Sequence, residues 1–341
     1  MNRKKIMLVF GTRPEAIKMA PLVHALRSRS EKFESIVCLT SQHREMLDQV
    51  LKIFEIKPDI DLNLMTQNQN LSNITSLILN EMQNVFRKYK PEAVLVHGDT
   101  TTTLATSLAA FYASIPVGHV EAGLRTYDLK APYPEEFNRQ ITSKISKWHF
   151  APTELTQKNL VSEGINKSSI IITGNTVIDA LHLILNRIYK NEIYQKNIIN
   201  SLNNQLSFNW QKERFILITA HRRENFGDGF LQIFTAIKEL AIKYPKIQFV
   251  YPVHLNPNAI KPAYEILKEI KNIHLIKPLE YATFIFLLKH SYLVLTDSGG
   301  IQEEAPSLGK PVLVMRDTTE RPEAVKSGTV DLVGSNYKKI I

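Results

Sequence analysis

The stretch AVLVHGDTTTTLATSLAAFY, residues 93–112, decides the fold class. A short apolar run that favours a strand leads into a polar turn, and a longer stretch of helical character follows. The same alternation continues along the chain on both sides of it. Strands that alternate with helices form βαβ units around a parallel sheet, so the sequence predicts an α/β protein.

The alternation occurs in two blocks, separated by a long helical stretch at about 177–202. Strands are predicted near 6–10, 35–40, 93–97, 116–120, 148–151 and 170–173, and then near 215–219, 248–251, 273–276, 292–296 and 311–314. A chain of 341 residues is also long for one domain, because about 100–200 residues per domain is usual. We therefore predict two domains, 1–176 and 177–341, with the active site in the cleft between them.

Composition excludes several classes of protein. With 44% hydrophobic and 22% charged residues, the chain is typical of a soluble globular protein. The single cysteine, Cys38, lies in an apolar run and cannot form an internal disulfide, which favours the core and a reducing compartment, the cytoplasm. No apolar run is long enough for a membrane span, and the first one meets Gly11 too early for a signal peptide. The net charge of +9 is spread along helical faces, which favours solubility over nucleic-acid binding.

Ligands of open parallel sheets bind at the carboxyl ends of the strands, so the residues after each predicted strand matter most. After the first strand, Thr12 and Glu15 have the spacing of a capping box, and Pro14 suits the first helical turn. Arg13 would then lie at a helix N-terminus with Lys18 about one turn further on, an arrangement that suits a phosphate. A solvated loop position is the alternative for Arg13.

Two neighbouring strands of the first block end at carboxylates. Asp99 and Glu121 each follow a strand and lie close to a histidine and a glycine. Both could face one substrate. The alternatives are helix capping by Asp99 and a salt bridge between Glu121 and Arg125.

A loop over residues 124–136 carries both signs of charge, and loops of this length are commonly functional. Glu135 and Arg139 stand four residues apart at the start of the next predicted helix. They are candidates for the site, and a surface ion pair is the alternative.

The second block offers two candidate phosphate sites. The strand at 215–219 is followed by His221, Arg222 and Arg223, three groups that can carry positive charge, although a solvated face would look the same. The strand at 292–296 is followed by Asp297, Ser298, Gly299 and Gly300. Two glycines let a backbone approach a phosphate, and Glu304 one turn later could accept hydrogen bonds from ribose hydroxyls; a plain tight turn is the alternative.

Several common motifs are absent from the sequence. No G-x-G-x-x-G follows a strand, no G-x-x-x-x-G-K-[ST] occurs, and no H-x-x-x-H or C-x-x-C occurs. We therefore expect no nicotinamide cofactor and no metal ion.

These segments, in this order, resemble the bacterial non-hydrolysing UDP-N-acetylglucosamine 2-epimerases over almost the whole chain. The matching segments are 10–21, 42–50, 96–111, 116–125, 134–139, 172–180, 221–225, 251–257 and 295–324. The resemblance implies two Rossmann-like domains of the glycosyltransferase-B type, a homodimer, and interconversion of UDP-GlcNAc and UDP-ManNAc without a cofactor. The reaction would proceed by anti elimination of UDP to a 2-acetamidoglucal and re-addition of UDP, and the product would supply ManNAc for surface polysaccharide.

The resemblance also assigns roles to individual residues. Catalytic positions are matched by Asp99, Glu121, Glu135, Arg139 and His221. Substrate contacts are matched by Asp99, Glu121, His221, Arg13, Lys18, Ser298, Gly299, Gly300, Glu304 and Arg321, with Phe284 and Leu279 near the uracil. A second, activating substrate site is matched by Gln42, His43, Arg222 and His254. Two departures are expected to matter: relatives tend to carry Gln at the position of Leu279, and the chain ends at Ile341, before the helices that close the second domain in this family.

Three other functions fit the same fold. A UDP-sugar glycosyltransferase would need an acceptor groove in the first domain, and a hydrolysing epimerase would release UDP and free N-acetylmannosamine. A catalytically silent UDP-sugar regulator would have no use for the proton-transfer groups at Asp99, Glu121, Glu135 and His221.

Overall fold

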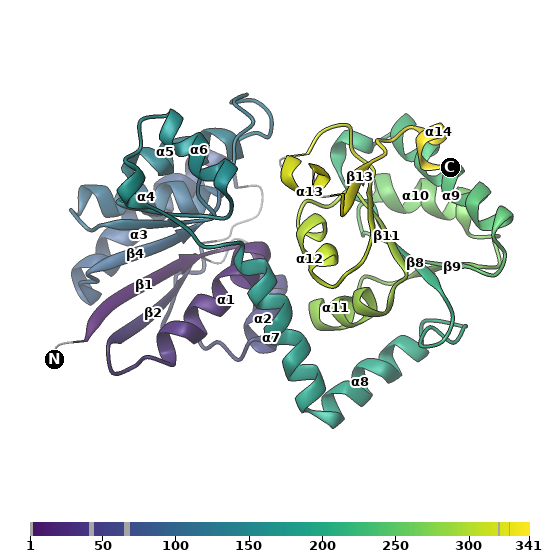
Figure 1. Cartoon of the computed structure of the whole chain (residues 1–341). Helices are drawn as coiled ribbons and strands as arrows, with labels where there is room; N and C mark the ends of the chain where they lie inside the picture. The colour runs from purple at the N-terminus through teal and green to yellow at the C-terminus, as the bar shows by residue number, and fades with distance from the viewer. Residues whose placement is uncertain (1–2, 41–43, 65–68, 320, 327) are drawn as a thin grey trace. The chain divides into compact units, whose positions relative to one another are not determined.

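The structure, a computed structural model, describes residues 3–40, 44–64, 69–319, 321–326 and 328–341. The chain divides into two compact units, Met1–Ala180 and Leu181–Ile341, and helix α7 (Thr176–Lys190) carries the chain from one to the other (Figure 1). Each unit is an α/β domain with its own sheet, so the predicted fold class is confirmed. Gln42 and His43 lie outside the described residues.

The first unit is built on a parallel sheet in the order β3-β2-β1-β4-β5-β6-β7. Its strands are β1 (Lys4–Phe10), β2 (Phe33–Leu39), β3 (Ile60–Asp61), β4 (Ala93–His97), β5 (Val117–Val120), β6 (Trp148–Ala151) and β7 (Ile170–Ile172). The strand order reverses between β1 and β4. In sheets of this kind, ligands bind outside the carboxyl ends of the strands beside such a reversal.

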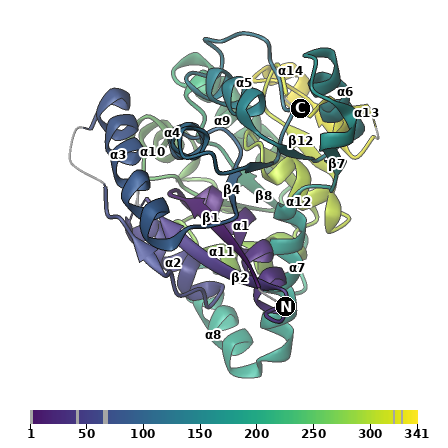
Figure 2. The same cartoon turned by 90° about the vertical axis from the view of Figure 1, so that its left-hand side faces the viewer.

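Helices cover this sheet, and its core is apolar. The helices are α1 (Arg13–Arg27), α2 (Arg44–Ile53), α3 (Leu71–Tyr89), α4 (Thr101–Tyr112), α5 (Glu135–Ile145) and α6 (Glu154–Ser162). Helices α3 and α4 lie side by side (Figures 1 and 2), and Met82 and Ala109 pack with Met7 and Cys38 of the sheet. Burial raises the pKa of the Cys38 thiol to about 12, so Cys38 is an inert core residue, as predicted.

The second unit repeats this architecture with six parallel strands in the order β10-β9-β8-β11-β12-β13. They are β8 (Phe215–Thr219), β9 (Gln248–Pro252), β10 (Ile273–Ile276), β11 (Leu293–Thr296), β12 (Val312–Val314) and β13 (Val330–Leu332). The helices of the unit after α7 are α8 (Glu192–Asn203), α9 (Asp228–Lys243), α10 (Pro257–Leu267), α11 (Tyr281–His290), α12 (Ile301–Ser307), α13 (Pro322–Lys326) and α14 (Tyr337–Ile340). The order reverses between β8 and β11, so residues after these two strands meet at one edge.

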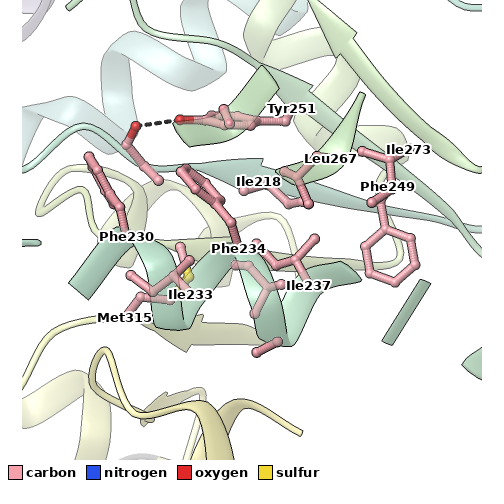
Figure 3. Packing of buried hydrophobic residues seen from close by; sticks show 14 of the residues in the cluster. Ile218, Phe230, Ile233, Phe234, Ile237, Phe249, Tyr251, Leu267, Ile273 and Met315 are labelled. Atoms are coloured by element: carbon pink, nitrogen blue, oxygen red, sulfur yellow. Dashed lines mark hydrogen bonds between the residues drawn. The ribbon is translucent and has the colours of Figure 1, made fainter. Parts of the chain in front are cut away.

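Aromatic side chains fill the core of the second unit (Figure 3). Phe230 and Phe234, one turn apart on α9, have ring centroids 5.3 Å apart, and Phe234 lies 5.8 Å from Tyr251 of β9. The buried Tyr251 hydroxyl donates to the carbonyl oxygen of Ala220 at 2.7 Å (Figure 3). This bond satisfies the one polar atom of the ring and fixes the segment that follows β8.

Each predicted strand is present, with shifts of one or two residues at the ends. The prediction omitted β3, which has only two residues, and β13, whose apolar pattern is interrupted by Asp331. The predicted helical stretch at 177–202 is interrupted: Asn191 caps α8 by accepting from the amide of Tyr194 at 2.9 Å. Within the described ranges, no helix combines the length and hydropathy needed to cross a bilayer.

Candidate active site

The loop after β1 has the predicted capping box. The Thr12 hydroxyl accepts from the amide of Glu15 at 3.4 Å, and Glu15 Oε2 accepts from the amide of Thr12 at 2.7 Å. The other oxygen of this buried carboxylate accepts from the hydroxyl of Thr100 at 2.6 Å. Glu15 therefore ties the loop that carries Arg13, the first residue of α1, to the loop that carries Asp99.

Glu121 lies directly after β5, where Lys18 and Asn175 donate hydrogen bonds to it and His97 lies close by. Lys18 Nζ lies 2.6 and 2.7 Å from its two carboxylate oxygens, Asn175 Nδ2 donates to Oε1 at 2.7 Å, and His97 Nε2 lies 3.1 Å from Oε2. The side chains of Lys18 and Glu121 are only 12% and 7% exposed. The backbone of Glu121 has φ +63°, which costs a residue other than glycine on the order of 1 kcal/mol or more. The donors hold the carboxylate in this strained position.

The alternative role for Glu121, a salt bridge to Arg125, is wrong. Arg125 is buried and forms a bidentate pair with Glu163, at 2.6 and 2.8 Å. Arg125 thus joins the loop after β5 to the end of α6, whereas Glu121 pairs with Lys18.

Asp99, after β4, is the more accessible of the two carboxylates. Its side chain is 27% exposed, and Oδ2 accepts from Arg139 Nη2 at 2.6 Å. The N-cap of α4 is Thr100, whose hydroxyl accepts from the amide of Thr103 at 3.2 Å, so the capping role considered for Asp99 belongs to its neighbour. Asp99 therefore does not cap α4.

Arg139 is buried on α5 between two carboxylates. Besides Asp99 it faces Glu136, with Nη1 3.4 Å from Oε2. Glu136 is wholly buried and also accepts from the amides of Thr126 and Tyr127, each at 3.1 Å. A surface ion pair between Glu135 and Arg139 is thus ruled out: Glu135 is half buried at the start of α5, and no ion pair joins the two within the described residues.

His119 holds the loop that carries Asp99 through a hydrogen bond to Gly98. Its Nε2 donates to the carbonyl oxygen of Gly98 at 2.7 Å, and the ring is wholly buried. Burial lowers the pKa of His119 to about 3. The ring is therefore neutral at physiological pH.

In the second unit, Asp297 organises the loop after β8. Oδ2 of this wholly buried residue accepts from the amides of His221 and Arg222 at 2.8 Å each, and from Asn225 Nδ2 at 3.3 Å. Oδ1 lies 3.3 Å from Nδ1 of His221. The ring of His254 stacks on that of His221 with centroids 5.4 Å apart. Burial lowers the pKa of His221, and Asp297 partly opposes the shift.

Two guanidinium groups converge on Gly299 at the same edge. A Cβ atom at Gly299 would lie 3.0 Å from Arg321 Nη1 and 3.4 Å from Arg222 Nη2. Arg321 also pairs with Glu303 at 3.1 Å, and the amide of Ser298 donates to the hydroxyl of Thr296 at 2.9 Å. The absence of a side chain at Gly299 is what lets both cations approach the backbone. Such a cluster suits an anion.

Residues expected near a nucleoside lie on α11 and α12 of this unit. Glu304 is buried, and its Oε1 accepts from the Tyr281 hydroxyl at 3.0 Å. Phe284 is half buried on α11, and Leu279 is half buried just before that helix. Gly300 is the N-cap of α12.

The sequence did not identify the partners that hold these groups. His97, Glu136 and Asn175 were not singled out, because their contacts join residues far apart in the chain. Asp297 was noticed only as part of a turn, although a carboxylate directly after a strand is the same signal that singled out Glu121. No group of three or more His, Cys, Asp or Glu side chains suited to a metal ion occurs among the residues that the structure describes.

Known proteins resemble this chain closely. The family profile for UDP-N-acetylglucosamine 2-epimerase matches residues 24–341. The UDP-N-acetylglucosamine 2-epimerase of Yersinia pestis is 58% identical over 337 residues, 99% of this chain and 88% of that protein, and the enzyme of Campylobacter jejuni is 57% identical over 338 residues with the same coverage. The crystal structure of UDP-GlcNAc 2-epimerase from Neisseria meningitidis bound to UDP-GlcNAc matches with a TM-score of 0.91 at 56% identity, over 99% of this chain and 89% of that one.

Proposed function

The chain belongs to the UDP-N-acetylglucosamine 2-epimerase family, and on that premise we propose that it is an isomerase that interconverts UDP-GlcNAc and UDP-ManNAc. The family resemblance found in the sequence is confirmed by these matches. The matches favour the epimerase over the two other enzymes considered, a glycosyltransferase of the same fold and a hydrolysing epimerase.

The reaction requires one proton to leave carbon 2 of the sugar and one to return on the opposite face. In the forward step a base takes the proton while the bond between carbon 1 and the UDP oxygen breaks, which yields 2-acetamidoglucal and UDP. In the return step an acid gives a proton to carbon 2 and the UDP oxygen bonds to carbon 1 again. Two carboxyl groups can carry out both transfers.

One observation carries this proposal: the segments directly after the neighbouring strands β4 and β5 carry Asp99 and Glu121, and each carboxylate has its own cation. Arg139 and Lys18 fix the geometry of the two carboxylates, and proton transfer depends on such positioning. Glu135, at the start of α5, is the third candidate for the two roles. The accessibility of Asp99 favours it as a group that meets substrate.

The second unit supplies the nucleotide-binding part of the proposal. The departing diphosphate gains negative charge, and cations placed in advance stabilise it. Arg222, Arg321 and His221 gather around Gly299 and Asp297 and suit this task. Glu304 is assigned to the ribose hydroxyls, the Ser298 and Gly300 backbone to the diphosphate, and Phe284 and Leu279 to the uracil.

Three finer features belong to the same proposal. The location is the cytoplasm, since the only cysteine is a buried thiol. The enzyme is a homodimer, as the family resemblance implies. Substrate activation at a second site would involve Arg222 and His254, which lie beside His221, and is tested by whether the rate rises sigmoidally with UDP-GlcNAc.

Proton NMR of UDP-GlcNAc in deuterium oxide, without NAD or added metal, tests the function. We expect the signal of the proton on carbon 2 to disappear while UDP-ManNAc forms. Asp99→Asn and Glu121→Gln should slow the exchange by about 10²-fold or more. Glu269→Gln is the matched control, because Glu269 is exposed and lies outside the site. If the signal persists in the wild type while UDP-GlcNAc still binds, the result would favour a glycosyltransferase or a regulator over an epimerase.

A further inference from the structure

Asp297 has an unusual set of partners. It is wholly buried, yet its hydrogen bonds go to main-chain amides and an asparagine, and no lysine or arginine pairs with it in the described part of the chain. Three donors, the amides of His221 and Arg222 and Nδ2 of Asn225, meet at the single oxygen Oδ2. That oxygen is therefore committed to holding the turn after β8.

The second oxygen, Oδ1, faces only the imidazole. It lies 3.3 Å from His221 Nδ1 and is buried, and it has no hydrogen-bond partner among the described residues. A carboxylate oxygen can only accept, so a stable contact requires a hydrogen on Nδ1. Nε2 then carries the lone pair in the neutral ring.

The other side of the ring is open. The side chain of His221 is 35% exposed, and Nε2 makes no hydrogen bond among the residues that the structure describes. Three charged or titratable neighbours surround the ring: Asp297, Arg222, and the stacked His254, with a 21° angle between the two ring planes. Stacking and the Asp297 contact together fix the ring plane and its direction.

We propose that Asp297 is a positioning residue that holds His221 in the tautomer with hydrogen on Nδ1 and presents Nε2 to the substrate. The inference rests on the proposed function for its catalytic consequence, but its structural content does not. A buried carboxylate that orients an imidazole also stabilises the ring when it takes up a second proton. His221 can thus accept a proton at Nε2, and in the protonated form donate from that atom to a diphosphate oxygen.

The first test reads the tautomer directly. In protein labelled with ¹⁵N-histidine, two-bond ¹H–¹⁵N correlation spectra distinguish a protonated from an unprotonated ring nitrogen, and loss of the signal in His221→Gln assigns it. Above the titration midpoint of His221, the wild type should show hydrogen on Nδ1 and none on Nε2. Hydrogen on Nε2 in the wild type would overturn the proposal, whatever any variant does.

The variant Asp297→Asn should reverse the tautomer. The amide oxygen must stay with the main-chain donors of His221 and Arg222, so the amide NH₂ group would face Nδ1. An NH₂ group can only donate, and Nδ1 would become the acceptor with hydrogen on Nε2. An unchanged tautomer in folded Asp297→Asn protein would contradict the mechanism.

The second test separates positioning from stability. Asp297→Asn should lower kcat for the exchange of the carbon 2 proton by about 10²-fold and change KM much less. The matched control is Tyr251→Phe, which removes the hydrogen bond to Ala220, the residue before His221, and leaves Asp297 in place. An equal loss of kcat in Tyr251→Phe, or a reversed tautomer with unchanged kcat, would refute the role. If the wild type shows the expected tautomer but no exchange, the proposed function fails and the tautomer assignment stands.

Discussion

The two sheets have the same strand order around their reversal points, but the carboxylates at those points have different partners. In the first unit, Asp99 and Glu121 pair with the side-chain cations Arg139 and Lys18. In the second unit, Asp297 is wholly buried and bonds to main-chain amides. A carboxylate held by side chains can change partners when substrate arrives, whereas one committed to the backbone can only orient its neighbours. On the proposed roles, the same edge of the sheet would serve proton transfer in the first unit and positioning in the second.

The largest expected difference between the two units is in their stability at low pH. His119 beneath the Asp99 loop is neutral when folded, with its pKa lowered from 6.5 to about 3 by burial. Because the unfolded chain binds a proton at this residue below pH 6.5 and the folded one does not, the stability from His119 is fully present above pH 6.5. It is lost as pH falls toward 3, by about 5 kcal/mol in total.

Tryptophan can report each unit, because the chain has two: Trp148 in the first unit and Trp210 in the second. We expect ¹⁹F NMR of fluorotryptophan-labelled protein in urea to show Trp148 unfolding at much lower urea at pH 4 than at pH 7. In His119→Gln, whose amide can still donate to Gly98, this dependence on pH should shrink. An equal dependence in the wild type and the variant would mean that other groups govern acid unfolding.

The sequence predicted which strand ends carry the residues of both sites, but not the hydrogen bonds and ion pairs that join those residues. Strand ends were predictable because apolar runs are local patterns, and the capping box of Thr12 and Glu15 follows from a spacing of three residues. The donors to Glu121 come from residues 103 and 54 positions away, Lys18 and Asn175, and no local pattern encodes such pairs. For the same reason the sequence showed that Asp297 follows a strand, but not that it bonds to the amide of His221, 76 positions away.

The Lys18 pair tests whether the first unit depends on side-chain cations. Lys18→Met leaves the buried carboxylate of Glu121 without its cation, and we expect the unfolding free energy to fall by about 3 kcal/mol, since Asn175 still donates to the carboxylate. The double variant Lys18→Met/Glu121→Gln removes the uncompensated charge and should recover part of this loss. Urea unfolding gives the values; a double variant less stable than the single one would show that Lys18 does not stabilise the fold through Glu121.

Glycine substitutions in the second unit give the smallest effect. Gly299→Ala places a methyl group against the guanidinium ends of Arg321 and Arg222, which can move at little cost in stability. We expect the melting temperature to stay nearly constant while UDP binds up to about tenfold more weakly in calorimetry, a loss of about 1.4 kcal/mol, because both cations are displaced from the backbone. Gly309→Ala is the converse control, since Gly309 has φ +70° and open space around it.

An alanine at Gly309 strains the backbone and should lower the unfolding free energy by about 1 kcal/mol without affecting UDP affinity. The two variants therefore separate fold from binding within one unit. If Gly299→Ala lowered stability and left UDP affinity unchanged, the cations around Gly299 would be structural, and the second unit would not hold the diphosphate through Arg222 and Arg321. The residues at the strand ends of the second unit would then contribute to stability and not to binding. The contrast between Asp297 and the carboxylates of the first unit would be lost.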